Sequence, residues 1–310
     1  MKIKGIDGFF RMASLFVGTD RVGSSNNYTH QMITKSMDEY IAKKKLEGKT
    51  YAYQDIIIAA LVRVFYLRPR LNRFVYSGVF YQRNWVDIAI AMQKNLRTGE
   101  QETTIKCRFT GRETLDEVKA VLDAEQTRAM TGSNGTDKFT GGPGNLPIPM
   151  VRALIKTIYT FDRWGWLSEK FMYTTSPFHS SIFFSNMKSI HLGPVWHHLY
   201  NFGNCGLFCS LGKDEVKPVV VDGKLTAANA LELAITEDER FIDGLTFAHV
   251  LKTLNRMCSD LTVLERRAEP DEIMYGFQSP KQKKWQLKFN KRVAKIQAKW
   301  LLKHRPGYTI

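Results

Sequence analysis

The feature that most constrains the fold is the run TYAYQDIIIAALVRVFYLRPRLN at residues 50–72. A helix built from this run is apolar on most of its faces, so it needs neighbouring elements on nearly every side. Pro69 limits the helix, because the residue before a proline avoids helical geometry. The apolar part is too short to span a bilayer and contains Arg63. We therefore expect a buried helix inside a globular domain.

Strand and helix patterns interleave along the rest of the chain. Helices are expected at residues 36–48, 114–130 and 150–171, and another after Asp243. Residues 73–93 predict two strands around a turn, and further strand-like runs cover 103–111, 180–186, 205–212, 217–225 and 230–238. The first 30 residues show only weak periodicity. This pattern predicts one α/β domain over residues 1–275, interrupted by a Gly/Pro/Asn-rich loop or lid at 131–147, and a basic C-terminal helix or tail over 276–310.

Composition excludes several classes of protein. No apolar run reaches membrane-spanning length, and Asp7 and Arg11 interrupt any signal-peptide core near the start of the chain, so we expect a soluble, cytoplasmic protein. Cys205 and Cys209 point to one face of a strand and are interpreted as buried small hydrophobic residues. They lack the second ligand pair that a zinc site requires, so no metal is expected.

Five sequence pieces occur in an order that resembles a known family. They are the buried helix with its proline-leucine-asparagine turn, Ser185-Asn186, CGLFCSLG, KPVVVDGKL and the turn DERFIDG at residues 238–244. In this order they resemble the catalytic domain of dihydrolipoyl acyltransferases of 2-oxoacid dehydrogenase complexes, and more distantly chloramphenicol acetyltransferase. The resemblance covers roughly residues 25–265 and leaves out the lipoyl and peripheral-subunit-binding domains.

This resemblance implies a chloramphenicol acetyltransferase-like fold, a two-layer sandwich of a large mixed sheet and helices. It also implies a homotrimer, or a higher assembly of trimers, with active sites between subunits. A coenzyme A thioester would be a substrate, and no tightly bound cofactor is expected. By resemblance, Ser185 is the donor to the oxyanion, Asp243 the structural aspartate and Arg21 a candidate partner of that aspartate. Asp238, Arg240 and Gly244 complete the structural loop.

The sequence departs from the family at the residue that does the chemistry. The family has a general-base histidine where this chain has Glu239. Imidazole, with a pKa near 6.5, exchanges protons readily at neutral pH, whereas glutamate has a reference pKa of about 4.3 and is the weaker base. Glu239 could form a salt bridge that holds the loop, act as the base itself, or be replaced by another histidine.

Other histidines offer that replacement. His197 and His198 lie in the loop GPVWHHLYNFGN after Ser185, which runs along the subunit interface in the family. They could reach a neighbouring subunit's Glu239, or they could be aromatic interface packing. His249 is interpreted as a helix-surface or packing residue, and His179 as a less favoured functional candidate.

The net charge of +15 resides mainly in the C-terminal segment. Residues 281–305 contain ten Lys or Arg and no acid, which leaves 35 basic against 30 acidic residues elsewhere. The segment predicts an amphipathic helix. Trp285 and Trp300 belong to its apolar face, and its basic remainder includes Lys288, Lys291, Arg292, Lys295 and Lys299. It could pack on its own assembly or bind an anionic membrane or an acidic protein; no specific nucleic acid is expected, since nothing supplies base readout.

Two functional hypotheses follow from the sequence. The first is a CoA-dependent acyltransferase without a lipoyl domain, with weakened or altered activity. The second is a catalytically inactive trimeric scaffold or binding pseudoenzyme that keeps the same fold.

Overall fold

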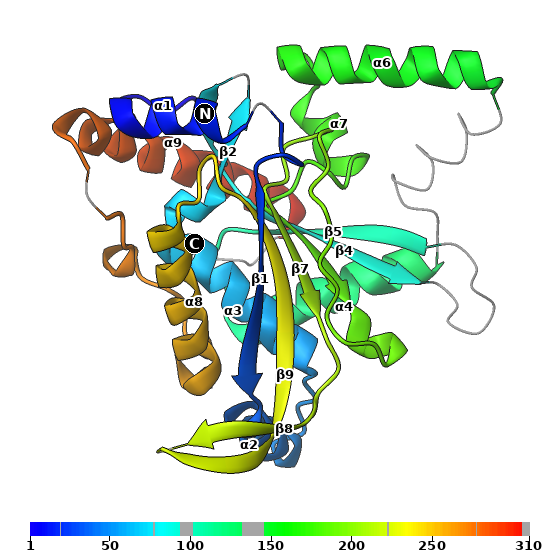
Figure 1. Cartoon of the computed structure of the whole chain (residues 1–310), viewed down its shortest axis with the longest axis vertical. Helices are drawn as coiled ribbons and strands as arrows, with labels where there is room; N and C mark the ends of the chain where they lie inside the picture. Colours follow the sequence, from blue (N-terminus) through cyan, green and yellow to red (C-terminus); the bar gives the residue numbers. More distant parts are fainter. Residues whose placement is uncertain are drawn as a thin grey trace.

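The computed structural model describes residues 1–18, 20–76, 78–93, 102–131, 146–221, 223–276 and 278–305. Most of the predicted loop at 131–147 lies outside the described residues. Within the described chain, helices α2, α3, α4 and α8 lie on one face of a large mixed sheet (Figure 1). This arrangement confirms the predicted α/β sandwich. None of the described helices is long and apolar enough to cross a membrane.

The main sheet has seven strands in the described residues, in the order β1-β9-β7-β6-β4-β5, with β8 also pairing with β9. Only the β4–β6 and β6–β7 pairs are parallel. Strands β2 and β3 form a separate hairpin. The strand bounds are β1 Ser25–Ile33, β2 Arg73–Tyr76, β3 Val79–Gln82, β4 Val86–Gln93, β5 Glu102–Phe109, β6 Ile182–Asn186, β7 Leu207–Leu211, β8 Glu215–Val221 and β9 Lys224–Asp238.

The apolar run that constrains the fold forms α3, which is buried along nearly its whole length. Arg63, in the middle of this helix, donates to the backbone carbonyls of Val263, Glu113 and Arg266, so its buried charge has hydrogen-bond acceptors. The other helices are α1 Gly8–Val17, α2 Lys35–Leu46, α3 Tyr53–Leu67, α4 Leu115–Thr131, α6 Ile148–Trp164, α7 Glu169–Thr174, α8 Gly244–Ser259 and α9 Pro280–His304, with short 3-10 turns at Pro69–Asn72, Met187–Ile190, Leu261–Leu264 and Pro270–Glu272.

Three local predictions need correction. Residues 73–93 form three strands rather than two, because the β2–β3 hairpin precedes β4. The run at 217–225 is a hairpin rather than one strand: β8 turns back into β9 through Gly223, which has a φ of +76°. The weakly patterned N-terminal region forms α1 and β1. The four cysteines are buried and free, as expected.

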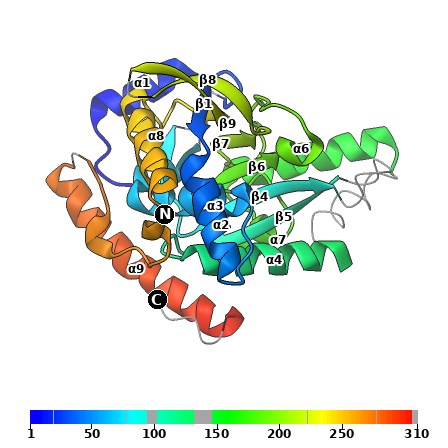
Figure 2. The same cartoon turned by 90° about the horizontal axis from the view of Figure 1, so that it is seen from below.

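Helix α9 packs on the body of its own chain and runs along one edge of the molecule (Figure 2). It contacts the chain just after β3, where Gln297 donates to the Asn84 carbonyl at 2.8 Å. Its apolar face is used in that contact, where Trp285, Phe289 and Leu301 are buried. The Trp285 indole donates to the Lys2 carbonyl at 2.9 Å, and Trp300 lies 5.2 Å from Trp85 between ring centroids. The exposed remainder of the helix carries its lysines.

Candidate functional site

The turn at residues 238–244 joins the end of β9 to α8, and two interactions hold it. Asp238, which is fully buried, accepts two hydrogen bonds from Arg240, at 2.8 Å from Nε and 2.7 Å from Nη2. Asp243 caps α8 by accepting from the Thr246 N–H at 2.6 Å. Glu239 therefore lies between two residues, Asp238 and Asp243, whose side chains are held in place.

Glu239 is exposed at the apex of this turn. Its backbone N–H donates to the Ser24 carbonyl at 2.9 Å, which fixes the main chain. Its carboxylate makes no ion pair or hydrogen bond with the described residues of the same chain. The loop-holding salt bridge considered for Glu239 is instead made next to it, by Arg240 with Asp238.

Arg21 does not pair with Asp243, which corrects the sequence-based assignment. The Arg21 guanidinium is buried and donates to the carbonyls of Asn201 at 2.7 Å and Tyr200 at 3.3 Å. Burial lowers the pKa of Arg21. The cation near Asp243 is Arg70, at 4.0 Å from the carboxylate. Arg21 therefore ties the N-terminal segment to the loop that follows β6.

Ser185 and Glu239 lie toward opposite ends of the sheet. Ser185 on β6 is level with Ser210 on β7 and, through it, with Ala234 on β9. Glu239 is five residues beyond Ala234, which is roughly 16 Å along the strand direction, and β9 is two strand spacings, about 10 Å, from β6. The two side chains therefore cannot meet within one chain.

The histidine loop covers the sheet face on which Ser185 lies. His197 stacks on Phe208 with ring centroids 4.3 Å apart, and its Nδ1 is 2.7 Å from the His198 carbonyl oxygen. His198 is exposed. Within one chain these contacts are aromatic packing, and neither imidazole is described in contact with Glu239.

The remaining two candidate histidines, His249 and His179, differ in their surroundings. His249 is exposed on α8. His179 is buried between Asp162, 2.9 Å from Nε2, and Ser176, 2.7 Å from Nδ1. Burial lowers the pKa of His179, although Asp162 opposes that shift. This chain of hydrogen bonds anchors the end of α6, and none of the described contacts joins it to Glu239.

Glu237 is a site residue that the sequence reasoning missed. It is 2% exposed, one of its carboxyl oxygens has no hydrogen-bond partner, and burial together with the nearby acids raises its pKa to about 8. The sequence pattern that could have revealed its burial is the alternation of Leu231, Leu233 and Ile235, which places residue 237 on the same inward face of β9. This raised pKa favours the protonated form of the Glu237 carboxyl near neutral pH.

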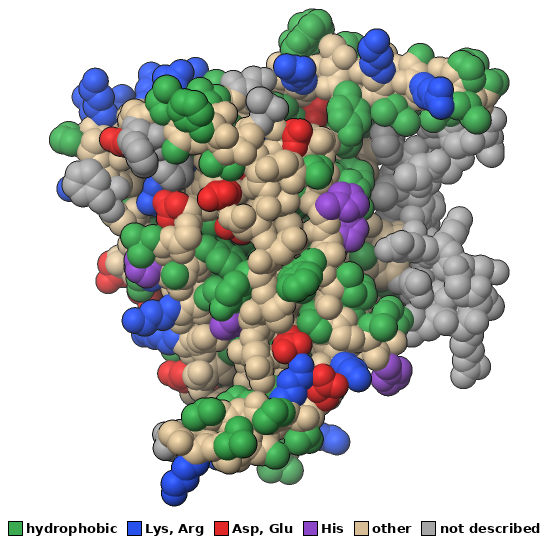
Figure 3. Space-filling model, in the orientation of Figure 1, with side chains coloured by type: hydrophobic (Ala, Val, Ile, Leu, Met, Phe, Trp, Pro, Cys, Tyr) green, Lys and Arg blue, Asp and Glu red, His purple; other side chains and the backbone are tan. Residues whose placement is uncertain are grey.

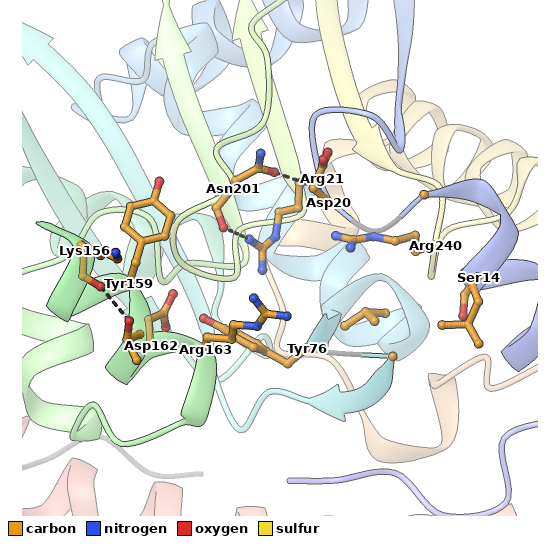
Figure 4. Close-up of a pocket in the computed structure, with 15 residues that line it drawn as sticks. Ser14, Asp20, Arg21, Tyr76, Lys156, Tyr159, Asp162, Arg163, Asn201 and Arg240 are labelled. Atoms are coloured by element: carbon orange, nitrogen blue, oxygen red, sulfur yellow. Dashed lines mark hydrogen bonds between the residues drawn. The ribbon is translucent and has the colours of Figure 1, made fainter.

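A cavity of about 620 Å³ opens beside the turn (Figure 4). Arg240 and Arg21 lie on one side of it, and Lys156 and Arg163 of α6 lie on the other. The lining contains four cations, Arg21, Lys156, Arg163 and Arg240, and two acids, Asp20 and Asp162, so it carries net positive charge even with Arg240 paired to Asp238. A lining of this charge suits an anionic ligand.

Solved structures share this architecture. A dihydrolipoamide acetyltransferase from Azotobacter vinelandii, in whose catalytic mechanism a serine, a histidine and an asparagine have roles, aligns with a TM-score of 0.53 and 14% identity over 83% of this chain and 88% of that chain. The fold is that of an acyltransferase core. A probable dihydrolipoamide acetyltransferase from Listeria monocytogenes gives a TM-score of 0.51 at 13% identity, over 83% of this chain and 94% of that chain.

A third structure agrees with these two. The truncated catalytic core of the 2-oxoacid dehydrogenase multienzyme complex from Thermoplasma acidophilum aligns with a TM-score of 0.51 and 13% identity, over 84% of this chain and 99% of that chain. No family model and no curated protein matches the sequence. At these identities the likeness establishes the fold of the chain.

Proposed function

We propose that this protein is a CoA-dependent acyltransferase whose active site forms between two copies of the chain, with Glu239 in the position of the general base. The observation that carries the proposal is the state of Glu239: an exposed carboxylate, without a partner among the described residues, on a turn fixed on both sides. A carboxylate in this state is available to a substrate or to a second chain.

The spacing of residues in the turn supports this assignment. In the Azotobacter enzyme the histidine and the asparagine with catalytic roles are four residues apart, as are Glu239 and Asp243 here. In both chains a serine precedes this pair by slightly more than 50 residues. The proposal transfers the position of the base to Glu239 and that of the oxyanion donor to Ser185.

The geometry of the sheet supports a shared site. Since Ser185 and Glu239 of one chain lie toward opposite ends of the sheet, a second copy must supply the serine if both act on one substrate. A closed homotrimer, alone or within a larger assembly, gives every Glu239 such a neighbour. The same contact would bring His197 and His198 to the interface.

In this scheme the Glu239 carboxylate accepts the proton of the acceptor thiol or hydroxyl as that group attacks the thioester carbonyl. The Ser185 hydroxyl donates to the oxyanion, and the departing CoA thiolate takes up the proton. A carboxylate is a weaker base than imidazole, and loss of an efficient base commonly lowers rates by about 10²- to 10⁴-fold. We expect slow transfer. The cationic cavity beside Arg240 suits the phosphates of coenzyme A.

The test is acyl transfer from acetyl-CoA, followed as release of free thiol, by wild type, Glu239→Gln and Glu239→His. Glutamine keeps the size of the side chain but cannot accept a proton, so transfer should fall to background. Histidine should raise the rate by about 10²-fold or more, because it restores the better base. Unchanged transfer in Glu239→Gln would eliminate the carboxylate as base.

The alternative is a catalytically inactive trimeric scaffold, and the observation that favours it is the absence of an imidazole near the turn in the described chain. A scaffold would show no thiol release in wild type, while Glu239→His alone could give activity.

A further inference from the structure

Helix α6 projects from the body of the molecule with most of its surface exposed (Figure 1). Asp162 is its one buried residue in the described structure. This carboxylate lies 2.9 Å from His179 and accepts from the Gly203 N–H at 2.9 Å. The helix is thus held by its C-terminal end. Among the described residues, Tyr159 packs on Phe202 at 5.0 Å between ring centroids, whereas Ile148, Met150, Leu154, Ile155 and Phe161 remain exposed.

The exposed helix is strongly amphipathic. Its apolar side chains follow helical spacing along one side, at Ile148, Val151, Leu154, Ile155, Ile158 and Tyr159. Arg152, Lys156 and Arg163 form an adjoining stripe beside Tyr159, with Lys156 and Arg163 at the cavity, and the helix has no exposed acid. Figure 3 shows hydrophobic and cationic side chains together along it, at the upper right.

Tryptophans flank the anchored end of the helix. Trp164 and Trp166 are 60% and 66% exposed, with ring centroids 4.8 Å apart. Tryptophan prefers the boundary between water and the hydrocarbon of a bilayer, because its ring is apolar and its N–H is polar. Two exposed indoles next to an apolar helix face are characteristic of that boundary.

Helix α1 extends this surface. It exposes Met12, Leu15 and Phe16, the last by 83%, together with Arg11, and it contains no acid. Both α1 and α6 lie at the same end of the molecule (Figure 1) and line opposite sides of the cavity beside the turn (Figure 4). The mouth of that cavity is therefore flanked by two helices that expose apolar and cationic side chains.

We propose that α1 and α6 together dock this end of the molecule on an anionic lipid surface. The apolar side chains would enter the headgroup boundary while the cations attract the lipid phosphates. A second copy of the same surface is the poorer occupant, because self-association would bring Arg11, Arg152 and Lys156 against their own copies without acids to neutralise them. The proposal does not depend on the proposed catalytic activity.

The docking surface differs from the one that the sequence suggested. The basic amphipathic helix α9 buries Trp285, Phe289 and Leu301 on its own chain and exposes mostly Lys and Arg, with Leu287 and Leu302. Helix α6 exposes more apolar side chains, together with cations. Lipid binding through α6 and α1 therefore predicts sensitivity to apolar and charge substitutions in these two helices, whereas binding through α9 predicts that charge reversals on α9 impair it.

The experiment is flotation of the full chain with vesicles of phosphatidylcholine, or of equal parts phosphatidylcholine and phosphatidylglycerol. Wild type should float with the anionic vesicles only. Leu154→Gln with Ile155→Gln should reduce the bound fraction by about tenfold or more, since each side chain loses membrane burial. Arg152→Glu should also weaken binding, and high salt should weaken wild-type binding.

Matched controls lie elsewhere on the surface. Val220→Gln with Leu225→Gln removes exposed apolar side chains from the β8–β9 hairpin at the opposite end, and Lys295→Glu reverses a charge on α9. Both controls should bind like wild type, and all variants should keep the wild-type melting temperature. The proposal is overturned if wild type ignores anionic vesicles, if only Lys295→Glu impairs binding, or if the α6 double variant changes the mass in solution and leaves flotation unchanged.

Discussion

At the residue scale, Glu239 differs from its neighbours because its carboxylate has no hydrogen-bond or ion-pair partner in the part of the chain that the structure describes. Asp238 is neutralised by Arg240, Asp243 caps a helix and lies near Arg70, and Glu237 is buried. Each neighbouring acid thus has a structural explanation within the chain. Glu239 has none, so we interpret it as the residue that a substrate or a second chain completes.

Glu237 should make stability depend on pH. Its folded-state pKa of about 8 lies above the ordinary value, so the folded protein retains a proton that the unfolded chain releases above about pH 4.5. The stabilisation is fully present below that pH and is lost as the pH rises through about 8.

The check is urea unfolding of wild type and Glu237→Gln between pH 5 and pH 8. The free energy of unfolding of wild type should fall relative to that of the variant by up to about 1.4 kcal/mol per pH unit, because glutamine holds no titrating proton. Parallel profiles for the two proteins would show that the carboxyl is ionised in the folded state.

The local structure around Asp243 could be predicted from the sequence. Asp-Gly ahead of an amphipathic run is a helix start, and Asp243 caps α8. The Arg21 assignment failed because it required a contact between residues more than 200 positions apart. No local pattern distinguishes Arg21 from Arg70 as the cation near Asp243.

At the element scale, α8 depends on its N-cap. Asp243→Ala should lower the free energy of unfolding by about 1 kcal/mol, because the Thr246 N–H loses its acceptor. Asp243→Ser should retain most of that stability, since serine also caps helices well. Thermal and urea unfolding of both variants measure the difference, and equal losses in the two would show that charge near Arg70, rather than capping, is what matters.

Elements with strong hydrophobic periodicity were predictable, and weakly patterned elements were not. Helix α3 and strands β6, β7 and β9 follow from their apolar runs. Strand β1 was missed because SNNYTHQMI is largely polar, and it forms by pairing with β9 along nine residues. The segment is a strand because it pairs with β9, and local sequence propensity does not reveal such pairing.

At the scale of the whole molecule, the order of the pieces predicted the α/β sandwich and its likeness to acyltransferase cores. The sequence did not reveal that α9 covers its own chain while α6 stands free. Both helices are amphipathic and basic, so their patterns are alike, and only the three-dimensional packing separates them. The sequence left open whether α9 packs on its own assembly or meets a membrane or an acidic protein, and the structure shows its apolar face buried on its own chain.

Because Ser185 and Glu239 are far apart in one chain, the proposed active site requires that two chains assemble. If one chain supplies the base and its neighbour the oxyanion donor, two different inactive chains can complement each other. A chain carrying Glu239→Gln retains Ser185, and a chain carrying Ser185→Ala retains Glu239.

The most direct measurement is thiol release by the two variants co-expressed and purified as mixed assemblies. With random mixing, about a quarter of the sites receive both intact residues, so activity should recover to about a quarter of the wild-type value, well above either variant alone. A mixture no more active than the sum of the separate variants would contradict a site shared between chains.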